Sequence, residues 1–323
     1  MDGTTILLRP ALTAFIGRQR SVVLLACCTV LLVCAPVFAE EVIAVLSSDA
    51  APYETAGEAL KKELGSSGLK VHSIELKDFD DEALKKALAD ATARFVAIGS
   101  DAAIALHKRV PASHVLVYCM VADPTGLGLT AGRASYGVDT LVPLKTQIEL
   151  IEDALPKARV VGMLFRSDSA ESMKLREAVK DALPAGWSLE AVAADKSSSM
   201  SKAVDILFER KIDVVWTAPD SSLYDQATVR SLLLASLRRK IPVFGYSLAF
   251  VKAGALLGVA IDPQTQGKQA ASLLERVRAG KLAAPVVETP EFEIAVNLIV
   301  AERISVNLPD KLILKTKQLI KAK

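Results

Sequence analysis

Short apolar runs alternate with longer amphipathic stretches along the chain from Glu41 onward. The runs are rich in Val, Ile and Leu and have the length of buried strands, whereas the stretches between them have the period of helices. This alternation predicts βαβ units, and strands without a polar face predict parallel sheets covered by helices on both faces. We therefore expect an α/β fold with Rossmann-like, doubly wound parallel sheets.

The alternation occurs twice. The first round predicts strands at 42–46, 70–76, 94–99 and 114–121 and helices at 53–66, 80–91 and 101–108. The second predicts strands at 159–165, 187–194, 213–218 and 242–246 and helices at 170–183, 198–210 and 225–239. A strand at 255–261, a helix at 264–279 and the segments up to 304 are too few for a third domain, so they must complete the first two. We expect lobe I to comprise 40–139 plus 261–286, and lobe II to comprise 140–260 plus 287–323.

Residues 1–39 have the pattern of a signal peptide. Arg18 and Arg20 precede the apolar run Val22–Ala35, and small residues come shortly before Glu40. This run of about 14 residues is short for a helix that spans a bilayer. We expect cleavage after Ala39 and a periplasmic protein; an uncleaved N-terminal anchor is the alternative.

The remaining chain has balanced charge. The full sequence has 39 Lys and Arg against 37 Asp and Glu, and segment 1–39 contains three Arg and one Asp, which leaves 36 of each. Without a basic tract, nothing indicates nucleic-acid binding. Three His in the whole chain leave little material for a metal or acid–base site, so we expect no metal and no cofactor.

Cys119 is the only cysteine after residue 39, which excludes an internal disulfide in the exported chain. It lies in the apolar run 114–121, so we expect a buried, inert thiol rather than a nucleophile. The sequence also lacks the glycine-rich phosphate loops and the nucleophile elbow of hydrolases. We therefore expect a binding protein and not an enzyme, with no catalytic residues.

Polar side chains follow most of the predicted strands. In lobe I these are Ser48, Ser100, Asp101 and Asp123; in lobe II they are Ser172, Asp220, Tyr246 and Ser247. Open α/β sheets bind ligands beyond the carboxyl ends of their strands, so two facing sheets would form a ligand cleft from these loops. The aromatic ring of Tyr246 or Tyr53 could stack on a ligand. Ser and Asp at such positions are also ordinary helix caps, and capping is the alternative for each of them.

Several motifs resemble one family of bacterial proteins. They include Ile241–Ser247, Val251–Ala255 and Gly258–Asp262 near the end of the chain, and further upstream Gly99-Ser100, Val121–Pro124, Gly162–Phe165 and Asp220-Ser221. In this order and spacing, residues 42 to 315 resemble the substrate-binding proteins of ABC transporters, in the group that includes tryptophan and tyrosine binders. Glu171 departs from this pattern, since it stands where the family has Asn.

The resemblance implies a type I periplasmic-binding-protein fold, in which two lobes joined by three crossovers close on a small molecule. By this analogy Ser100 and Ser172 would contact a carboxylate, while Asp123 and Asp220 would accept hydrogen bonds from an ammonium group. The expected ligand is small and polar or zwitterionic, such as an amino acid. The expected partner of the monomer is an ABC permease in the membrane, and the alternative is an exported sensor that signals to a membrane receptor.

Overall fold

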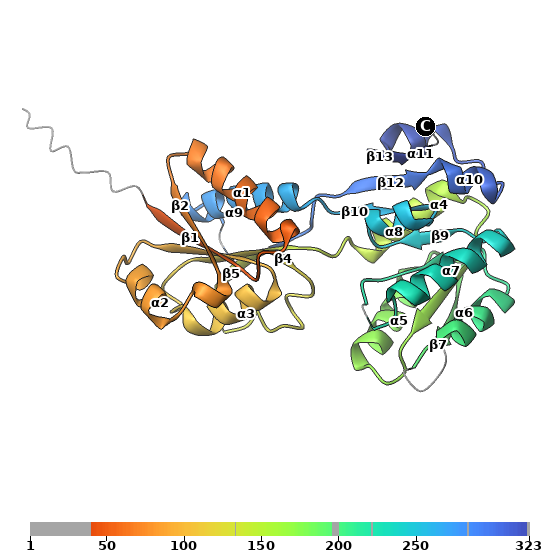
Figure 1. Ribbon diagram of the computed structural model, residues 1–323, viewed down its shortest axis with the longest axis horizontal. Helices are drawn as coiled ribbons and strands as arrows, with labels where there is room; N and C mark the ends of the chain where they lie inside the picture. The colour runs from red at the N-terminus through yellow and green to blue at the C-terminus, as the bar shows by residue number, and fades with distance from the viewer. Residues whose placement is uncertain (1–39, 133, 196–199, 221, 283, 322–323) are drawn as a thin grey trace, which may run out of the picture. The chain divides into compact units, whose positions relative to one another are not determined.

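The chain forms two separate sheets, each with helices on both faces (Figure 1). The computed structural model describes residues 40–321 apart from 133, 196–199, 221 and 283. The proposed signal peptide therefore lies outside the described residues. None of the described helices is long and apolar enough to cross a membrane.

The sheet of lobe I is parallel throughout, in the order β11-β5-β4-β3-β1-β2. Its strands are β1 (Glu41–Leu46), β2 (Lys70–Glu75), β3 (Arg94–Ile98), β4 (Leu116–Val121), β5 (Ser135–Asp139) and β11 (Val287–Glu288). Its helices are α1 (Ala51–Ser66), the short 3-10 helix η1 (Leu76–Asp78), α2 (Asp81–Leu88), α3 (Ser100–Arg109) and α9 (Pro263–Arg278). Helices α1 and α9 lie so close that a Cβ at Gly267 would overlap the Ala56 carbonyl.

The sheet of lobe II has the order β13-β12-β10-β9-β8-β6-β7. Its strands are β6 (Val160–Phe165), β7 (Ser188–Ala193), β8 (Val214–Trp216), β9 (Val243–Gly245), β10 (Leu257–Ala260), β12 (Glu293–Asn297) and β13 (Gln318–Ile320). Its helices are α4 (Leu144–Ala154), α5 (Ala170–Ala182), α6 (Met200–Glu209), α7 (Gln226–Arg239), α8 (Leu248–Ala253), α10 (Leu298–Arg303) and α11 (Asp310–Lys315). Strands β10 and β12 are antiparallel, so this sheet is mainly rather than wholly parallel.

Each sheet separates two apolar layers. In lobe I, Val96 packs with α1 and α9 on one face, while Phe95 packs with α3 on the other, and both side chains are fully buried. In lobe II, the Trp216 side chain likewise packs in one apolar layer and the Val215 side chain in the other. Since alternate side chains of one strand enter different cores, a strand needs an apolar residue at nearly every position. This accounts for the continuous apolar runs that predicted the fold.

The chain passes between the two sheets three times, which confirms the expected two-lobed fold with three crossovers. The passages are residues 140–143, 261–262 and 289–292. Strand β11 pairs with β5 in the first sheet, so lobe I extends two residues beyond the expected limit at 286. Strand β5 and helix α4 were not anticipated, because the Gly-rich segment before β5 has the composition of a loop.

Two buried glutamines hold the ends of the first passage. Gln266 of α9 donates through Nε2 to the Asp139 carbonyl at 3.1 Å and accepts from the Met120 amide at 3.0 Å. Gln147 of α4 donates to the Val142 carbonyl at 2.7 Å and accepts from the Trp216 indole at 2.9 Å. Each glutamine thus fixes one end of the passage within its own lobe.

Candidate functional site

Ser47, Gly99 and Tyr53 meet where β1 and β3 end in lobe I. The Ser47 hydroxyl accepts the Ala102 amide at 3.0 Å, so the cap of α3 comes from the neighbouring strand. Gly99 has a φ of 96°, and a Cβ there would overlap both Ser47 and Tyr53. Only glycine fits this position.

The alternative role of Ser100, capping α3, is wrong. Gly99 is the N-cap residue and has no capping side chain, while Ser100 is the first residue of the helix. Its side chain is half-buried, and Asp101 beside it is exposed. Contact between either residue and a ligand stays a prediction.

Ser48 and Asp123 bond to their own turns. The Ser48 hydroxyl accepts the Ala50 amide at 3.3 Å. Asp123 is exposed, has a left-handed φ of 48° and accepts the Gly126 amide through Oδ1 at 2.9 Å. Burial raises the pKa of the nearby Asp139 carboxyl, and the charge of Asp123 adds to this rise against the opposing amide bonds. This edge of lobe I is therefore acidic.

The turn between β6 and α5 holds Ser172. Ser169 is the N-cap of α5 and accepts the Ser172 amide at 3.2 Å. Ser172 is thus the third residue of the helix and not its start, and its side chain is buried. Its Oγ accepts the Arg166 amide at 2.9 Å, and no described residue accepts the hydroxyl hydrogen. That hydrogen is available to a ligand.

Asp220 organises the turn after β8. Its Oδ1 accepts the amide and the hydroxyl of Ser222, at 2.9 and 2.5 Å, and lies 3.3 Å from the Leu223 amide. None of the hydrogen bonds among the described residues uses Oδ2. Capping of the next helix was the alternative role for Asp220, and it is wrong because α7 begins at Gln226 and Asp225 caps it. One carboxylate oxygen of Asp220 thus remains open to a ligand.

Arg166 supplies positive charge at the strand ends of lobe II, and it is already engaged. Its guanidinium donates two parallel hydrogen bonds to Asp168, at 2.8 and 2.7 Å. The pKa of Arg166 is raised chiefly by this hydrogen bonding, and the charges of Asp168, Asp220 and Asp195 also contribute. With three carboxylates around one guanidinium, the edge remains negative.

A cavity of about 340 Å³ brings Ser172 and Asp220 together. Its polar lining consists of two carboxylates, Glu171 and Asp220, and three serines, 169, 172 and 222. The other lining residues are apolar or proline, and none is basic. The volume is within the range of small-molecule sites. This cavity can accept hydrogen bonds from a cationic donor and offers hydroxyl groups to a second polar group.

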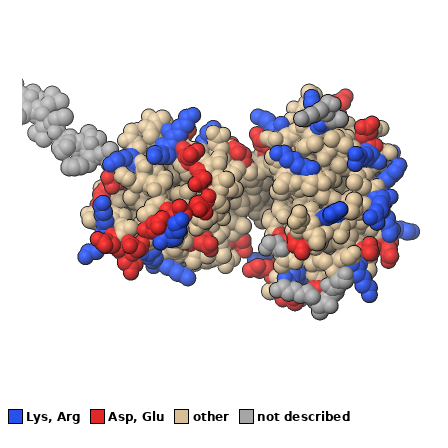
Figure 2. Space-filling view, in the orientation of Figure 1, with Lys and Arg blue, Asp and Glu red and all other residues tan. Residues whose placement is uncertain are grey.

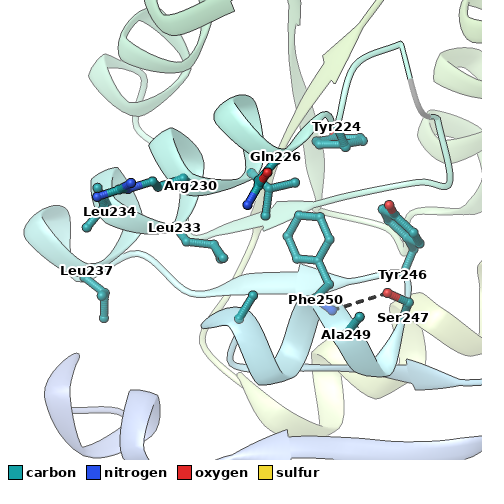
Figure 3. A pocket seen from close by; sticks show the side chains of 12 residues that line it. Tyr224, Gln226, Arg230, Leu233, Leu234, Leu237, Tyr246, Ser247, Ala249 and Phe250 are labelled. Carbon is teal, nitrogen blue, oxygen red and sulfur yellow. Dashed lines mark hydrogen bonds between the residues drawn. The ribbon is translucent and has the colours of Figure 1, made fainter.

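Tyr246 and Ser247 line a different cavity of lobe II (Figure 3). Ser247 is the N-cap of α8 and accepts the Phe250 amide at 3.3 Å, which is the capping role considered for it. The Tyr246 ring lies 5.2 Å from that of Phe250 and 6.1 Å from that of Tyr224. The eight predicted residues are thus distributed over both lobes, and two of them share the 340 Å³ cavity.

Three residues at these edges escaped the sequence analysis. Asp195 follows β7 and accepts the amide and hydroxyl of Ser167, and the rule applied to the other strand ends would have found it. Asp139 was missed together with β5. Tyr224 precedes a helix in a turn, where the sequence gives no signal for its burial.

The interior of lobe I holds the thiol that was considered as a nucleophile. Cys119 is fully buried, and this burial raises its pKa to about 12, so the thiol stays protonated and inert. Within the described residues, no group of three or more His, Cys, Asp or Glu could hold a metal ion.

Two mainly parallel α/β lobes joined by three crossovers have the fold of type I periplasmic binding proteins. The chain belongs to the family described as ABC transporter substrate binding protein, whose model matches residues 42–320. A search of curated proteins finds no match.

Solved structures share the fold at low sequence identity. A ligand-free, open substrate binding protein with adhesive properties from Clostridium difficile has a TM-score of 0.72 and 18% identity, covering 88% of this chain and 100% of that one. An ABC domain in complex with L-Trp from Streptococcus pneumonia has a TM-score of 0.60 and 19% identity, covering 87% and 99%. A sugar-binding protein of an ABC transporter from Bacillus halodurans has a TM-score of 0.53 and 11% identity, covering 80% and 97%.

Proposed function

We propose that this protein is the periplasmic component of an ABC importer and captures a small zwitterionic molecule that bears an ammonium group, such as an amino acid. It acts as a monomer that is released after cleavage of its signal peptide and delivers the ligand to the permease. The ligand binds at the strand ends of the two lobes.

The observation that carries this proposal is the 340 Å³ cavity, which is lined by two carboxylates and by no Lys, Arg or His side chain. An ammonium group would donate to the open oxygen of Asp220, and the Ser172 hydroxyl would donate to the ligand carboxylate near the first turn of α5. Charge-assisted bonds to a desolvated carboxylate are among the stronger hydrogen bonds. The structure in complex with L-Trp supports this ligand class, because L-Trp carries both groups.

The acidic edge of lobe I supports the same class. Asp123 and Asp139 would be stabilised by a positive charge, whereas an inorganic anion or a dicarboxylate would be repelled by both edges. A neutral sugar would gain hydrogen bonds but no charge complementarity. The charges therefore favour an ammonium-bearing ligand over a sugar.

A thermal-shift and titration screen tests the proposal with matched sets of compounds. Each set contains an L-amino acid, its N-acetyl derivative, which lacks the ammonium group, and its amide, which lacks the carboxylate. We expect the free amino acid that binds to raise the melting temperature, its N-acetyl derivative to lose binding and its amide to retain part of it. Binding of N-acetyl derivatives or of neutral sugars alone would contradict the ammonium assignment.

A further inference from the structure

A second cavity lies in lobe II, between α7 and α8, with a volume of about 490 Å³ (Figure 3). Its walls are mostly apolar and include Val229, Leu233 and Leu237 of α7 and Ala249, Phe250 and Ala253 of α8, while Gln226, Arg230 and Ser247 add polar groups. The first three residues are four apart and form one stripe along the helix. At 1.5 Å per residue, the lining from Gln226 to Leu237 extends about 16 Å. The groove is long enough for an extended apolar chain.

Arg230 lines this groove and has no ion pair among the described residues. The segment 226–261, which includes both helices, contains five basic residues and not a single acidic one. Lys and Arg side chains also gather over lobe II in the space-filling view (Figure 2). The groove thus combines apolar walls with an unneutralised positive charge.

A buried polar group is unused at the head of the groove. Tyr224 lines the cavity and is 6% exposed, and its hydroxyl has no hydrogen-bond partner among the described residues. Burial raises the pKa of this phenol, which therefore remains a neutral donor. A buried donor without a partner costs free energy that a ligand acceptor would recover.

We infer that the α7–α8 groove is a second binding site, for an amphipathic organic anion with an extended apolar body. The apolar body lies along Leu233, Leu237 and Phe250, and the anionic group pairs with Arg230. The cavity volume matches that of small-molecule sites, whereas a docked protein would need an interface of at least about 1,000 Å². The carboxylates of the 340 Å³ cavity would repel the same anion, so the two sites select opposite charges.

Titration calorimetry of the full exported chain with decanoate, below its micelle concentration, tests this inference. We expect one decanoate per protein and weaker binding of decylamine, which has the same chain length and a positive charge. Arg230→Gln should weaken decanoate binding about tenfold, in the range for loss of a bond to a charged group. Arg238→Gln is the matched control, since Arg238 lies on α7 and does not line the cavity.

Two further variants distinguish binding in the groove from non-specific adsorption and from binding in the 340 Å³ cavity. Ala249→Trp would fill the groove and should abolish decanoate binding. Glu171→Gln, at a residue that lines the 340 Å³ cavity and not the groove, should leave decanoate binding unchanged. Equal binding of decanoate and decylamine, or equal losses in the Arg230 and Arg238 variants, would overturn the inference. A dimer that dissociates when decanoate is added, seen by light scattering, would instead assign the groove to a second copy of the chain and equally overturn it.

Discussion

The two lobes place the same residue types after their strands and use them differently. In lobe I, Ser47 caps a helix that follows another strand, and Asp123 closes its own turn. In lobe II, Asp220 holds its turn through one oxygen only, and the Ser172 hydroxyl hydrogen has no acceptor among the described residues. A serine or aspartate after a strand is therefore not a sufficient sign of a binding residue. The unused hydrogen-bonding capacity of each side chain distinguishes the two roles.

The largest expected effect is the difference in ligand affinity between variants of the two aspartates that are predicted to bind the ligand. Asp220→Asn keeps the acceptor for Ser222 and removes the charge, so it should weaken amino-acid binding by roughly 10- to 100-fold, from the loss of about 1.5–3 kcal/mol. Asp123→Asn should weaken it by about fivefold or less, because Asp123 is exposed and solvent screens its charge. Calorimetric titration of both variants with the amino acid that binds measures the difference.

Asp225→Ala is the control for these variants, because Asp225 caps α7 with a bond of 2.7 Å to the Thr228 amide and does not line the cavity. It should lower the melting temperature and leave the affinity unchanged. If Asp220→Asn also lowers the melting temperature and leaves the affinity unchanged, Asp220 is a structural residue. Asp220 and Asp123 would then have the same role in their lobes.

A smaller effect on stability is expected from the serines of lobe I. Ser47→Ala removes the acceptor of the Ala102 amide at the start of α3, and loss of such a cap costs about 1 kcal/mol. Ser100→Ala removes a half-buried hydroxyl that caps nothing, so its unfolding free energy should be nearly unchanged. Denaturant unfolding of the two variants compares them, and equal losses would show that the cap does not depend on Ser47.

The smallest effect concerns pH. The pKa of Asp139 is raised by burial, so the folded state binds this proton more tightly than the unfolded state does. Stability contributed by the protonated form is present below the ordinary value of 3.8 and is lost as the pH rises towards the raised pKa. Asp139→Asn should therefore flatten the fall in stability over this interval.

Asp90 provides the control of opposite sign. Its pKa is lowered, first by the Thr92 hydroxyl and then by the Thr92 amide, so its contribution is present above the ordinary value and is lost as the pH falls through the lowered pKa. Asp90→Asn should thus remove stability at neutral pH rather than in acid. The measurement is the melting temperature of both variants across this pH range. The same dependence of melting temperature on pH in the two variants would contradict the raised pKa of Asp139 and the lowered pKa of Asp90.

The fold was largely predictable because buried parallel strands need apolar residues on both faces, and few other structures have this pattern. Strand β5 (SYGVD) was missed because Ser135, Gly137 and Asp139 interrupt its apolar character. Gly137 is required there since a Cβ would overlap the Tyr118 ring, and this contact comes from β4. Such a packing constraint between strands has no local signature in the sequence.

The candidate site was predictable only as a set of loops. The strand-end rule named Asp220 and Ser172, which share a cavity, but it could not distinguish them from Asp123, which closes its own turn. That distinction depends on hydrogen bonds such as the one that the Ala102 amide of α3 donates to the Ser47 hydroxyl, which joins residues 55 positions apart. Tyr246 was named as a stacking residue, but its neighbours Tyr224 and Phe250 come from other turns and helices.

The assembly of lobe I from two distant parts of the chain affects how the protein is made. Helix α9 completes the apolar layer that contains α1, and strand β11 completes the sheet of lobe I. The ribosome synthesises both elements only after most of lobe II. At 5–20 residues per second, residues 140–288 take roughly 7–30 s to appear. During this interval α1 has no partner helix, and the apolar side chains that later contact α9 remain exposed. The nascent chain therefore cannot complete its first lobe in order of synthesis, and a chain that ends after β10 should expose that apolar layer permanently.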